Sequence, residues 1–551
     1  MGGKHIMNQS RRRFLRSTLA TTSAAFLLAL ILTDGLAISA ENGSAIQLSE
    51  EHQVAVNRRR RIYVYHDVGA PQESFALEPQ VWRDLHLKLF DRPDQQVDTI
   101  GWCFDEGNLA MHPSTVIPVA DFPQIKTWWD AELDIVKFAI EETRKMDLEA
   151  FYEYRVNGSD IDFGKDTDPG ERGWVLTPMK ERHPDWLLPS WPTPKWNFKV
   201  PGVREFKVAI LRELVQNYDF DGVDLDFSRQ PPSLRTGHAW EDRDGMTEFV
   251  RAVRAMFQEV AARRGRPLLL AVRVPSNVPG CHYDGYDIET WVEQNLVDII
   301  IPGDRSIDID VDGFHRIIGQ RNIKLIPSLD DYHATKGYRH YPIEFFRGVF
   351  SNWWHQGVDG VQTMNFHNIS ADFAASDPEI KSIVGPHMAT AAQEQSYREI
   401  GDPQTMRFKD KMFVLQQRWG ELGGDGRWDF YQHTNCQAPL PVSIPHDGLP
   451  TIQTLYIGDD LAAHAKRIQN IEVRVLLSGD DSHDIEVKVN GVSLAAPSKD
   501  ADWRIFTAIA RQFAVGENLI SVRSAGSPQE PRQLSIEKLE VLVDYDEHGT
   551  Q

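Results

Sequence analysis

Short apolar runs alternate with longer amphipathic segments from residue 61 to residue 368. The short runs are typical of buried strands, and the longer segments have the period of helices with one buried face. Eight such strand–helix units follow one another, which predicts an α/β fold whose parallel strands close into a (β/α)8 TIM barrel. The predicted strands are residues 62–66, 98–104, 148–155, 222–227, 268–274, 298–302, 323–328 and 360–366.

Helical periodicity is clear at six places between these strands, and a further helix at 389–400 is interpreted as the closing helix and exit linker. The third strand is followed by a long insertion, residues 156–200, with many prolines and four tryptophans. Because indole rings stack on sugar rings, we expect this loop either to line a glycan cleft, through Trp196 among others, or to pack on the barrel. The six predicted helices are residues 131–146, 202–217, 246–264, 288–296, 311–321 and 343–356.

Beyond the barrel the pattern changes to short alternating runs at 471–477, 483–489, 503–508, 518–522 and 539–544. Alternation with glycine-containing turns predicts an antiparallel β-sandwich. A sandwich in this position resembles the carbohydrate-binding modules of secreted glycosidases, and the alternative is a domain that braces the barrel without binding sugar. Together with the features of the first residues, described next, these patterns predict four parts. They are a signal peptide at 1–40, a linker at 41–60, a barrel at 61–400 and a sandwich at 401–546.

The first residues have the features of an export signal. An arginine-rich stretch at 10–16 precedes an uncharged region whose apolar centre, 24–32, is too short to span a bilayer. Paired arginines before Phe-Leu resemble a twin-arginine (Tat) signal, and small residues near position 40 offer a cleavage site. We expect export to the periplasm or the extracellular space, and no stable membrane insertion once the signal is removed.

Charge and cysteine content narrow the function classes. The whole chain has a net charge of −21, and without residues 1–40 it has 54 basic and 79 acidic residues, a net charge of −25, so nucleic-acid binding is not expected. Three widely spaced cysteines, Cys103, Cys281 and Cys436, do not predict a disulfide framework or a zinc site. The acidic run at 308–312 lacks the spacing of a calcium loop, and no nucleotide or serine-hydrolase motif is found, so we expect neither a metal nor a cofactor.

The fourth predicted strand is the most informative part of the sequence. Val223, Leu225 and Phe227 alternate with Asp224 and Asp226, so one face of the strand is apolar and the other acidic. Strands of a parallel sheet are normally apolar on both faces, and two buried carboxylates need a polar space beside them. In a closed barrel that space is the mouth at the C-terminal ends of the strands.

The other strand ends add acids, arginines and amides to the predicted site. Cleavage of a glycosidic bond requires two carboxyl groups facing each other across a gap, one as proton donor and one as nucleophile or base. Arginines beside them either neutralise the acids or grip an anionic substrate. The catalytic candidates are Asp226, Asp304, Asp330 and Asp224, and the substrate-binding candidates are His66, Glu153, Arg155, Arg229, Arg273, Trp196 and Asn365.

The region from about residue 63 to 368 resembles the glycosyl hydrolase-like 10 proteins and related bacterial barrel glycosidases, most closely at 201–229. The Asp-Gly-x-Asp-x-Asp core is also similar to that of family 18 chitinases, but Ser228 occupies the position of their catalytic glutamate. The resemblance implies an exported glycoside hydrolase acting on a poly- or oligosaccharide. By analogy with barrels that use acids of the fourth and sixth strands, it favours Asp226 paired with Asp304.

Two alternatives stay open at the level of sequence. A polysaccharide lyase would use Arg155 and Arg273 to neutralise a uronate and a His or Tyr to remove the proton. A non-catalytic barrel that binds glycan would fit the loss of an acid at Ser228. The glycan, its linkage and the oligomeric state are not predicted.

Overall fold

A computed structural model describes residues 44–546, except 69–71, 105–106, 120–122, 159–175, 191–193, 230, 304, 332–334, 336–339, 418–437, 446, 480–484 and 526–533. The predicted signal peptide and residues 159–175 and 191–193 of the insertion therefore lie outside the described residues.

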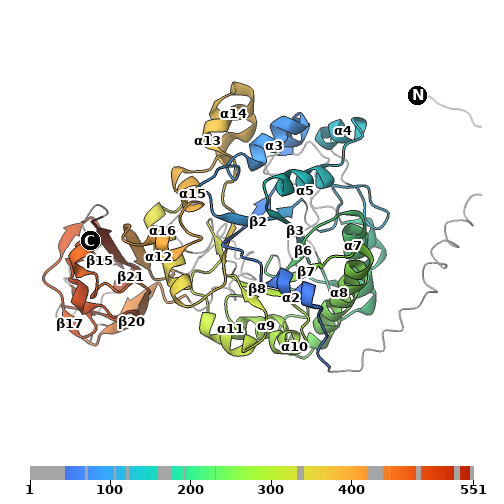
Figure 1. Ribbon diagram of the computed structural model, residues 1–551. Helices are drawn as coiled ribbons and strands as arrows, with labels where there is room; N and C mark the ends of the chain where they lie inside the picture. Colours follow the sequence, from blue (N-terminus) through green and yellow to red (C-terminus); the bar gives the residue numbers. More distant parts are fainter. Residues whose placement is uncertain are drawn as a thin grey trace, which may run out of the picture. The chain divides into compact units, whose positions relative to one another are not determined.

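One parallel sheet forms the centre of the first domain (Figure 1). Its nine strand segments are hydrogen-bonded in the order β10-β11-β1-β2-β3-β6-β7-β8-β9. All the predicted strands are present in it. The bounds are β1 Ile62–Asp67, β2 Val97–Cys103, β3 Glu149–Arg155, β6 Gly222–Asp226, β7 Leu269–Val274, β8 Ile299–Pro302, β9 Lys324–Leu325, β10 Ser328–Asp330 and β11 Val361–Met364.

The two ends of this sheet, β9 and β10, are halves of one predicted strand. Pro327 lies between them and has no N–H group, which interrupts the hydrogen-bond ladder. The segment is nevertheless bonded on both sides, because Ile326 N donates to Ile300 O at 3.0 Å and Gln362 N donates to Pro327 O at 2.8 Å. The sheet thus closes on itself with eight strand positions, as the sequence predicts.

Helices surround the ring of strands (Figure 1). Local signals set their ends. α5 begins after Asp134, whose side chain accepts from Val136 N and Lys137 N, and α8 ends just before Gly265, which has φ 71°. The bounds are α2 Glu50–Val56, α3 Pro79–Leu87, α4 Pro123–Asp130, α5 Ile135–Lys145, α6 Pro178–Arg182, α7 Pro201–Asn217, α8 Arg243–Arg264, α9 Val278–Asp284, α10 Ile288–Glu293, α11 Val311–Ile318, α12 Ile343–His355, α13 Ala371–Ala375, α14 Pro378–Val384, α15 Ala391–Ser396 and α16 Pro403–Met406.

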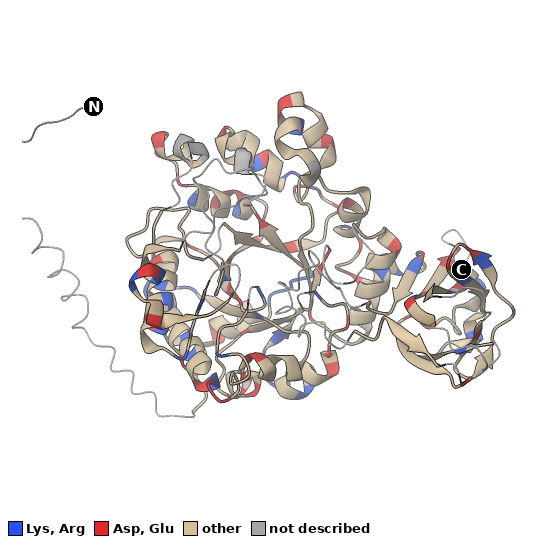
Figure 2. Ribbon diagram, turned by 180° about the vertical axis from the view of Figure 1, so that it is seen from behind, with Lys and Arg blue, Asp and Glu red and all other residues tan. Residues whose placement is uncertain are grey.

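Alternation along the strands separates two buried regions. Outward residues such as Val223 and Leu225 join the large core between the sheet and the helices. Inward residues at the N-terminal end of the barrel, among them Phe151, Leu269 and Ile299, form a separate apolar plug. Above this plug the inward residues become polar, and Figure 2 shows acidic and basic residues on the strands as well as on the helices. The plug leaves the C-terminal end of the barrel for chemistry.

The second domain is the predicted antiparallel β-sandwich with its own apolar core. One sheet has the order β12-β21-β15-β19-β18, with β13 also paired to β21, and the other has the order β14-β20-β16-β17. The bounds are β12 Lys411–Val414, β13 Val442–Ile444, β14 Thr451–Ile457, β15 Ile468–Gly479, β16 Ile485–Val489, β17 Val492–Ser493, β18 Ser498–Asp500, β19 Trp503–Thr507, β20 Gly516–Ser524 and β21 Leu534–Tyr545.

The sandwich contacts the barrel through α12. A Cβ atom at Gly348 would lie 2.1 Å from Met412 O of β12, so only glycine allows this close approach. Asn352 then fixes the neighbouring strand, since its side chain donates to Tyr456 O at 2.9 Å and accepts from Gly458 N at 2.8 Å. The exact domain boundary at residue 400 stays a prediction.

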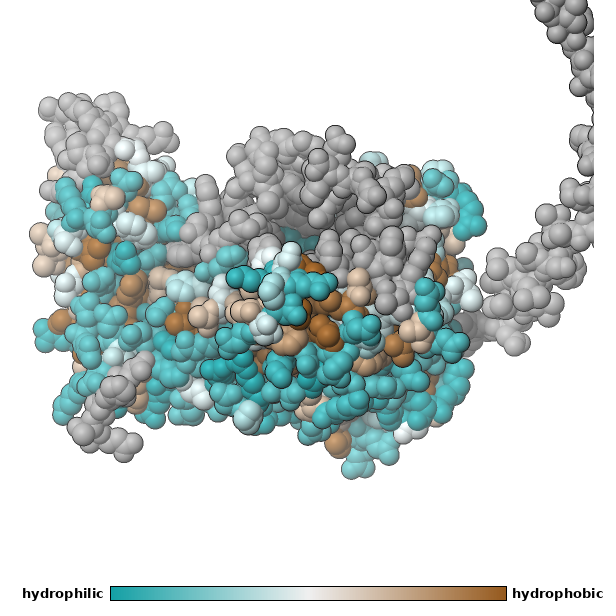
Figure 3. All heavy atoms as spheres, turned by 90° about the horizontal axis from the view of Figure 1, so that it is seen from above, coloured by the Kyte–Doolittle hydropathy of each residue, from teal (hydrophilic) through white to brown (hydrophobic). Residues whose placement is uncertain are grey.

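The surface is largely hydrophilic on the face shown in Figure 3, with small separate hydrophobic patches. Among the described helices, none combines the length and the apolar character needed to cross a membrane. The described end of the insertion holds α6 and a short hairpin of β4 Leu187–Leu188 with β5 Lys195–Trp196.

Candidate active site

Asp226 is the best-positioned acid at the C-terminal end of the barrel. It is the last residue of β6, and its side chain is fully buried. Arg273 Nη1 donates to Asp226 Oδ2 at 3.0 Å, and Tyr65 OH donates to the same oxygen at 3.3 Å. The backbone N–H of Arg229 donates to Oδ1 at 2.8 Å. Donors from three segments therefore fix the orientation of this carboxylate.

Arginines and carboxylates alternate around Tyr65. Arg155 Nε donates to Tyr65 OH at 3.0 Å, and Arg155 Nη2 forms an ion pair with Asp67, the most exposed member of the group. Arg273 is fully buried and paired with Asp226. Two of the three predicted arginines, Arg155 and Arg273, thus have carboxylate partners, which is the neutralising role that the sequence leaves open.

A second pair of acids lies one layer deeper. Glu153 and Asp224 are register partners on β3 and β6, and both are buried. Gly101 on β2 makes room for them, because a Cβ atom there would lie 1.8 Å from Glu153 Oε1. Burial and the neighbouring Asp224 raise the pKa of Glu153 well above its ordinary value. Burial likewise raises the pKa of Asp224 to about 7. The two carboxyl groups therefore retain protons at a pH where exposed acids are ionised.

Asp330 stands on the opposite wall, at the end of β10. It is fully buried, Asn365 Nδ2 donates to its Oδ1 at 3.0 Å, and Arg305 Nη1 lies 3.7 Å from its Oδ2. Arg305 and Asn365 both have left-handed backbones, with φ of 61° and 54°. Such conformations in non-glycine residues gather at functional sites. Asp304, the other predicted proton donor, lies outside the described residues.

The structure does not bring every predicted residue to this cluster. His66 lies on the outward face of β1, in an aromatic cluster with Trp102 and His86 at ring-centroid distances of 4.9 and 5.2 Å, and burial lowers its pKa to about 4. Trp196, which belongs to the insertion, is buried, and its indole N–H donates to Asn108 Oδ1 at 3.1 Å. Neither side chain lies in the barrel lumen.

Sequence reasoning missed three residues of the lumen, Tyr63, Tyr65 and Gln362. Tyr65 alternates with His66 along β1 and reaches the upper layer beside Asp67, which the strand-end prediction does include, while Tyr63 and Gln362 are register partners near Glu153 and Asp224. Reading the alternate positions of β1, as was done for β6, would identify Tyr63 and Tyr65.

Comparisons with known proteins agree with the geometry. Residues 204–300 match the model of glycosyl hydrolases family 18, a segment that contains β6, β7 and Asp226. Glycosyl hydrolase YngK of Bacillus subtilis is 28% identical over 120 residues, which are 21% of this chain and 22% of that protein. The chain therefore aligns with about a fifth of the length of this relative.

Solved structures give looser likenesses. Alpha-L-fucosidase isoenzyme 2 from Paenibacillus thiaminolyticus has a TM-score of 0.40 and 11% identity, covering 65% of this chain and 51% of that one. The glycoside hydrolase domain of PgaB (BpsB) from Bordetella bronchiseptica has a TM-score of 0.38 and 12% identity, covering 60% and 99%.

The chain thus combines a closed parallel barrel that has acids at the C-terminal strand ends with a fourth-strand segment that is similar to a family of glycosyl hydrolases. This segment also contains Ser228, the position at which the resemblance to family 18 chitinases implies a catalytic glutamate.

Proposed function

We propose that this protein hydrolyses glycosidic bonds in a poly- or oligosaccharide, with Asp226 as one of two catalytic carboxyl groups. The orientation of Asp226 by Arg273, Tyr65 and the backbone of Arg229 is the observation that carries the proposal. Export by the Tat route, an anionic substrate and kinship with the glycosyl hydrolase-like 10 proteins belong to the same proposal.

The chemistry requires a partner for Asp226. One carboxyl group gives its proton to the leaving oxygen and the bond from that oxygen to the anomeric carbon breaks. The other carboxylate attacks that carbon or takes a proton from the attacking water. Asp226, held by cationic and neutral donors, suits the second role. The proposed proton donors are Asp330 on the facing wall and Asp304, which lies outside the described residues.

The lyase alternative is less well supported by the surroundings of Tyr65. A lyase needs a side chain that removes a proton from the sugar ring. Burial raises the pKa of Tyr65 well above its ordinary value, so its hydroxyl stays protonated. His66, the other nearby candidate, lies outside the lumen.

Replacing Asp226 by Asn tests the proposal. Purified protein is screened against neutral, sulfated and uronate-containing polysaccharides, and release of reducing ends is measured. On the glycan that responds, Asp226→Asn is expected to lower the rate by about 10²–10⁴-fold, since it removes the reacting carboxylate but keeps the shape of the side chain.

Asp359→Asn is the matched control. Asp359 lies at the opposite end of the barrel, where it accepts from Leu325 N at 2.9 Å, and it is expected to leave the rate unchanged. Equal turnover by folded Asp226→Asn would refute the assignment. Glycan binding without any release of reducing ends would instead identify the non-catalytic barrel that the loss of an acid at Ser228 suggests.

A further inference from the structure

Two aromatic side chains are exposed on the loops that follow β6 and β7, the strands that carry Asp226 and Arg273. Trp240 lies just before α8 and is 39% exposed, and Tyr283 lies on α9 and is 59% exposed. The other large hydrophobic side chains exposed in the described part of the barrel are aliphatic. Loops that follow the strands of a barrel form its C-terminal end. Both aromatic residues therefore lie at the end that holds the candidate active site.

The two loops pack against each other. The His282 ring lies 4.3 Å from the Trp240 ring, measured between centroids, and His282 precedes Tyr283 in the chain. A Cβ atom at Gly285 would lie 2.4 Å from Ala239 O, so the two backbones approach closely where α9 ends. Trp240, His282 and Tyr283 therefore belong to one surface, which we call the aromatic rim.

Contacts with the end of β6 hold the aromatic rim in place. In the loop after β7, Tyr286 OH donates to Phe227 O at 3.3 Å, and the two rings lie 5.1 Å apart. Phe227 directly follows Asp226 in the chain. In the other loop, Arg243 Nη1 donates to Trp240 O at 2.8 Å, and the guanidinium lies 4.6 Å from the centre of the indole ring. A surface that is already ordered loses little conformational entropy when it binds a ligand.

The basic side chains of this surface have carboxylate partners. The pairs are His238 with Glu241 at 2.9 Å, His282 with Glu289 at 2.9 Å and Arg243 with Asp287 at 3.5 Å. This part of the described surface therefore lacks the excess positive charge that a nucleic acid or another strongly anionic polymer requires. Its polar atoms still exchange hydrogen bonds with hydroxyl groups. Uncharged sugar rings combine hydroxyl groups with C–H faces that stack on aromatic rings.

We propose that the aromatic rim binds uncharged sugar rings of the glycan that is cleaved at Asp226, and so holds the chain beside the candidate active site. This inference rests on the proposed glycosidase function. A protein partner fits less well, because the exposed apolar area consists of a few rings among polar groups, whereas stable protein interfaces bury about 1,200–2,000 Å². The stacking role that the sequence assigns to Trp196 thus passes to two other loops.

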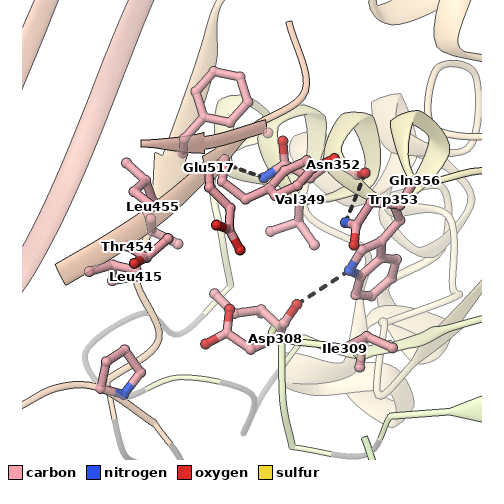
Figure 4. A pocket seen from close by; sticks show the side chains of 16 residues that line it. Asp308, Ile309, Val349, Asn352, Trp353, Gln356, Leu415, Thr454, Leu455 and Glu517 are labelled. Carbon is pink, nitrogen blue, oxygen red and sulfur yellow. Dashed lines mark hydrogen bonds between the residues drawn. The ribbon is translucent and has the colours of Figure 1, made fainter. Parts of the chain in front are cut away.

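The hollow of about 240 Å³ between α12 and the sandwich offers no comparable site (Figure 4). Asp308 and Glu517, the two acids that line it, are exposed to solvent. The Trp353 indole N–H donates to Ile307 O at 3.3 Å. These three side chains are solvated or already bonded, so they give no reason to expect a ligand there.

Retention on polysaccharides tests the proposed role of the aromatic rim. Every chain carries Asp226→Asn, so that binding is measured without turnover. The full chain is mixed with microcrystalline cellulose, chitin and starch as uncharged glycans and with alginate as an anionic one. Retention is expected on at least one uncharged glycan. Trp240→Ala and Tyr283→Ala are each expected to weaken it by about threefold to tenfold, because each removes one stacking ring.

Two further variants are the controls. Tyr283→Phe keeps the ring and is expected to be retained like the parent chain. Val54→Ala removes an exposed apolar side chain from α2, whose Val56 belongs to the apolar plug at the N-terminal end of the barrel, and is expected to have no effect.

Several outcomes would overturn the inference. They are retention on alginate alone or on no glycan, and retention that both alanine variants leave unchanged. A parent chain that is a dimer in gel filtration, with Trp240→Ala a monomer, would show that the aromatic rim is an interface between copies. Release of reducing ends by the original protein is measured separately. If it fails while retention depends on Trp240 and Tyr283, the proposed hydrolysis is wrong and this binding site stands.

Discussion

At the residue scale, the deeper acid pair is the least ordinary feature of the barrel. Glu153 and Asp224 face each other across neighbouring strands in a space that exists because residue 101 is glycine. Two ionised carboxylates at such a place repel each other, and burial penalises both charges. The pair therefore makes folding depend on pH.

The sign of this dependence follows from the raised pKa of Asp224. An unfolded chain ionises this group near pH 3.8, whereas the folded protein keeps its proton up to about pH 7. The stability that the protonated group contributes is complete below about pH 4 and is lost as the pH rises to about 7. We expect Asp224→Asn, which cannot ionise, to raise the melting temperature relative to the original protein more at pH 8 than at pH 4.

Thermal unfolding at the two pH values measures this difference. Asp359→Asn serves again as the control, with no change in pH dependence expected. If Asp224→Asn and the original protein lose stability in parallel between pH 4 and pH 8, the pair is not protonated as described.

The sequence predicts the acids of the site better than their surroundings. Asp226, Arg155 and Arg273 are found because alternation in a strand and the ends of parallel strands are visible in a sequence. His66 shows the limit of this reasoning. It is the last residue of the first predicted strand, but alternation along the strand places its side chain on the outward face. The position of Trp196 could not be predicted for another reason. An irregular insertion has no periodic pattern that would show which of its side chains pack on the barrel.

At the scale of elements, the fit of α12 against β12 depends on Gly348. Gly348→Ala gains up to about 1 kcal/mol of helix propensity, but the new methyl group would lie 2.1 Å from the backbone oxygen of Met412. Overpacking against backbone costs about 1–3 kcal/mol, so we expect net destabilisation and a lower melting temperature. Glu344→Ala on the same helix is the control, and an equal or higher melting temperature for Gly348→Ala would contradict the contact.

Element ends were predicted less well than element order. α10 ends at Glu293 and α11 at Ile318, a few residues before the predicted ends, because Asn295 and Gly319 adopt positive φ. The seventh strand was predicted as one piece, but Pro327 divides it. β12 and β14 were not predicted at all. The four residues of β12 are too few to show the alternation of a strand, although β12 forms the contact between the sandwich and α12 of the barrel.

At the scale of the whole molecule, export is the prediction that the described residues leave untested. Replacing Arg11, Arg12 and Arg13 by Lys keeps the charge of the predicted signal peptide but removes the arginine pair on which the Tat resemblance rests. We expect this variant to stay in the cytoplasm, as measured by cell fractionation, while Arg16→Lys is exported normally. Unchanged export of the triple variant would rule out the Tat route.

Both domains are completed by strands made late in synthesis. In the barrel, β1 lacks one neighbour until the ribosome has produced β11, about 300 residues later. In the sandwich, β12 can pair only after β21 has been made, and β21 also pairs with β13 and β15. Growing chains therefore carry open strand edges, which are templates for aggregation. A premature stop before residue 534 would remove the strand shared by three others, so truncated chains should be found in inclusion bodies or degraded.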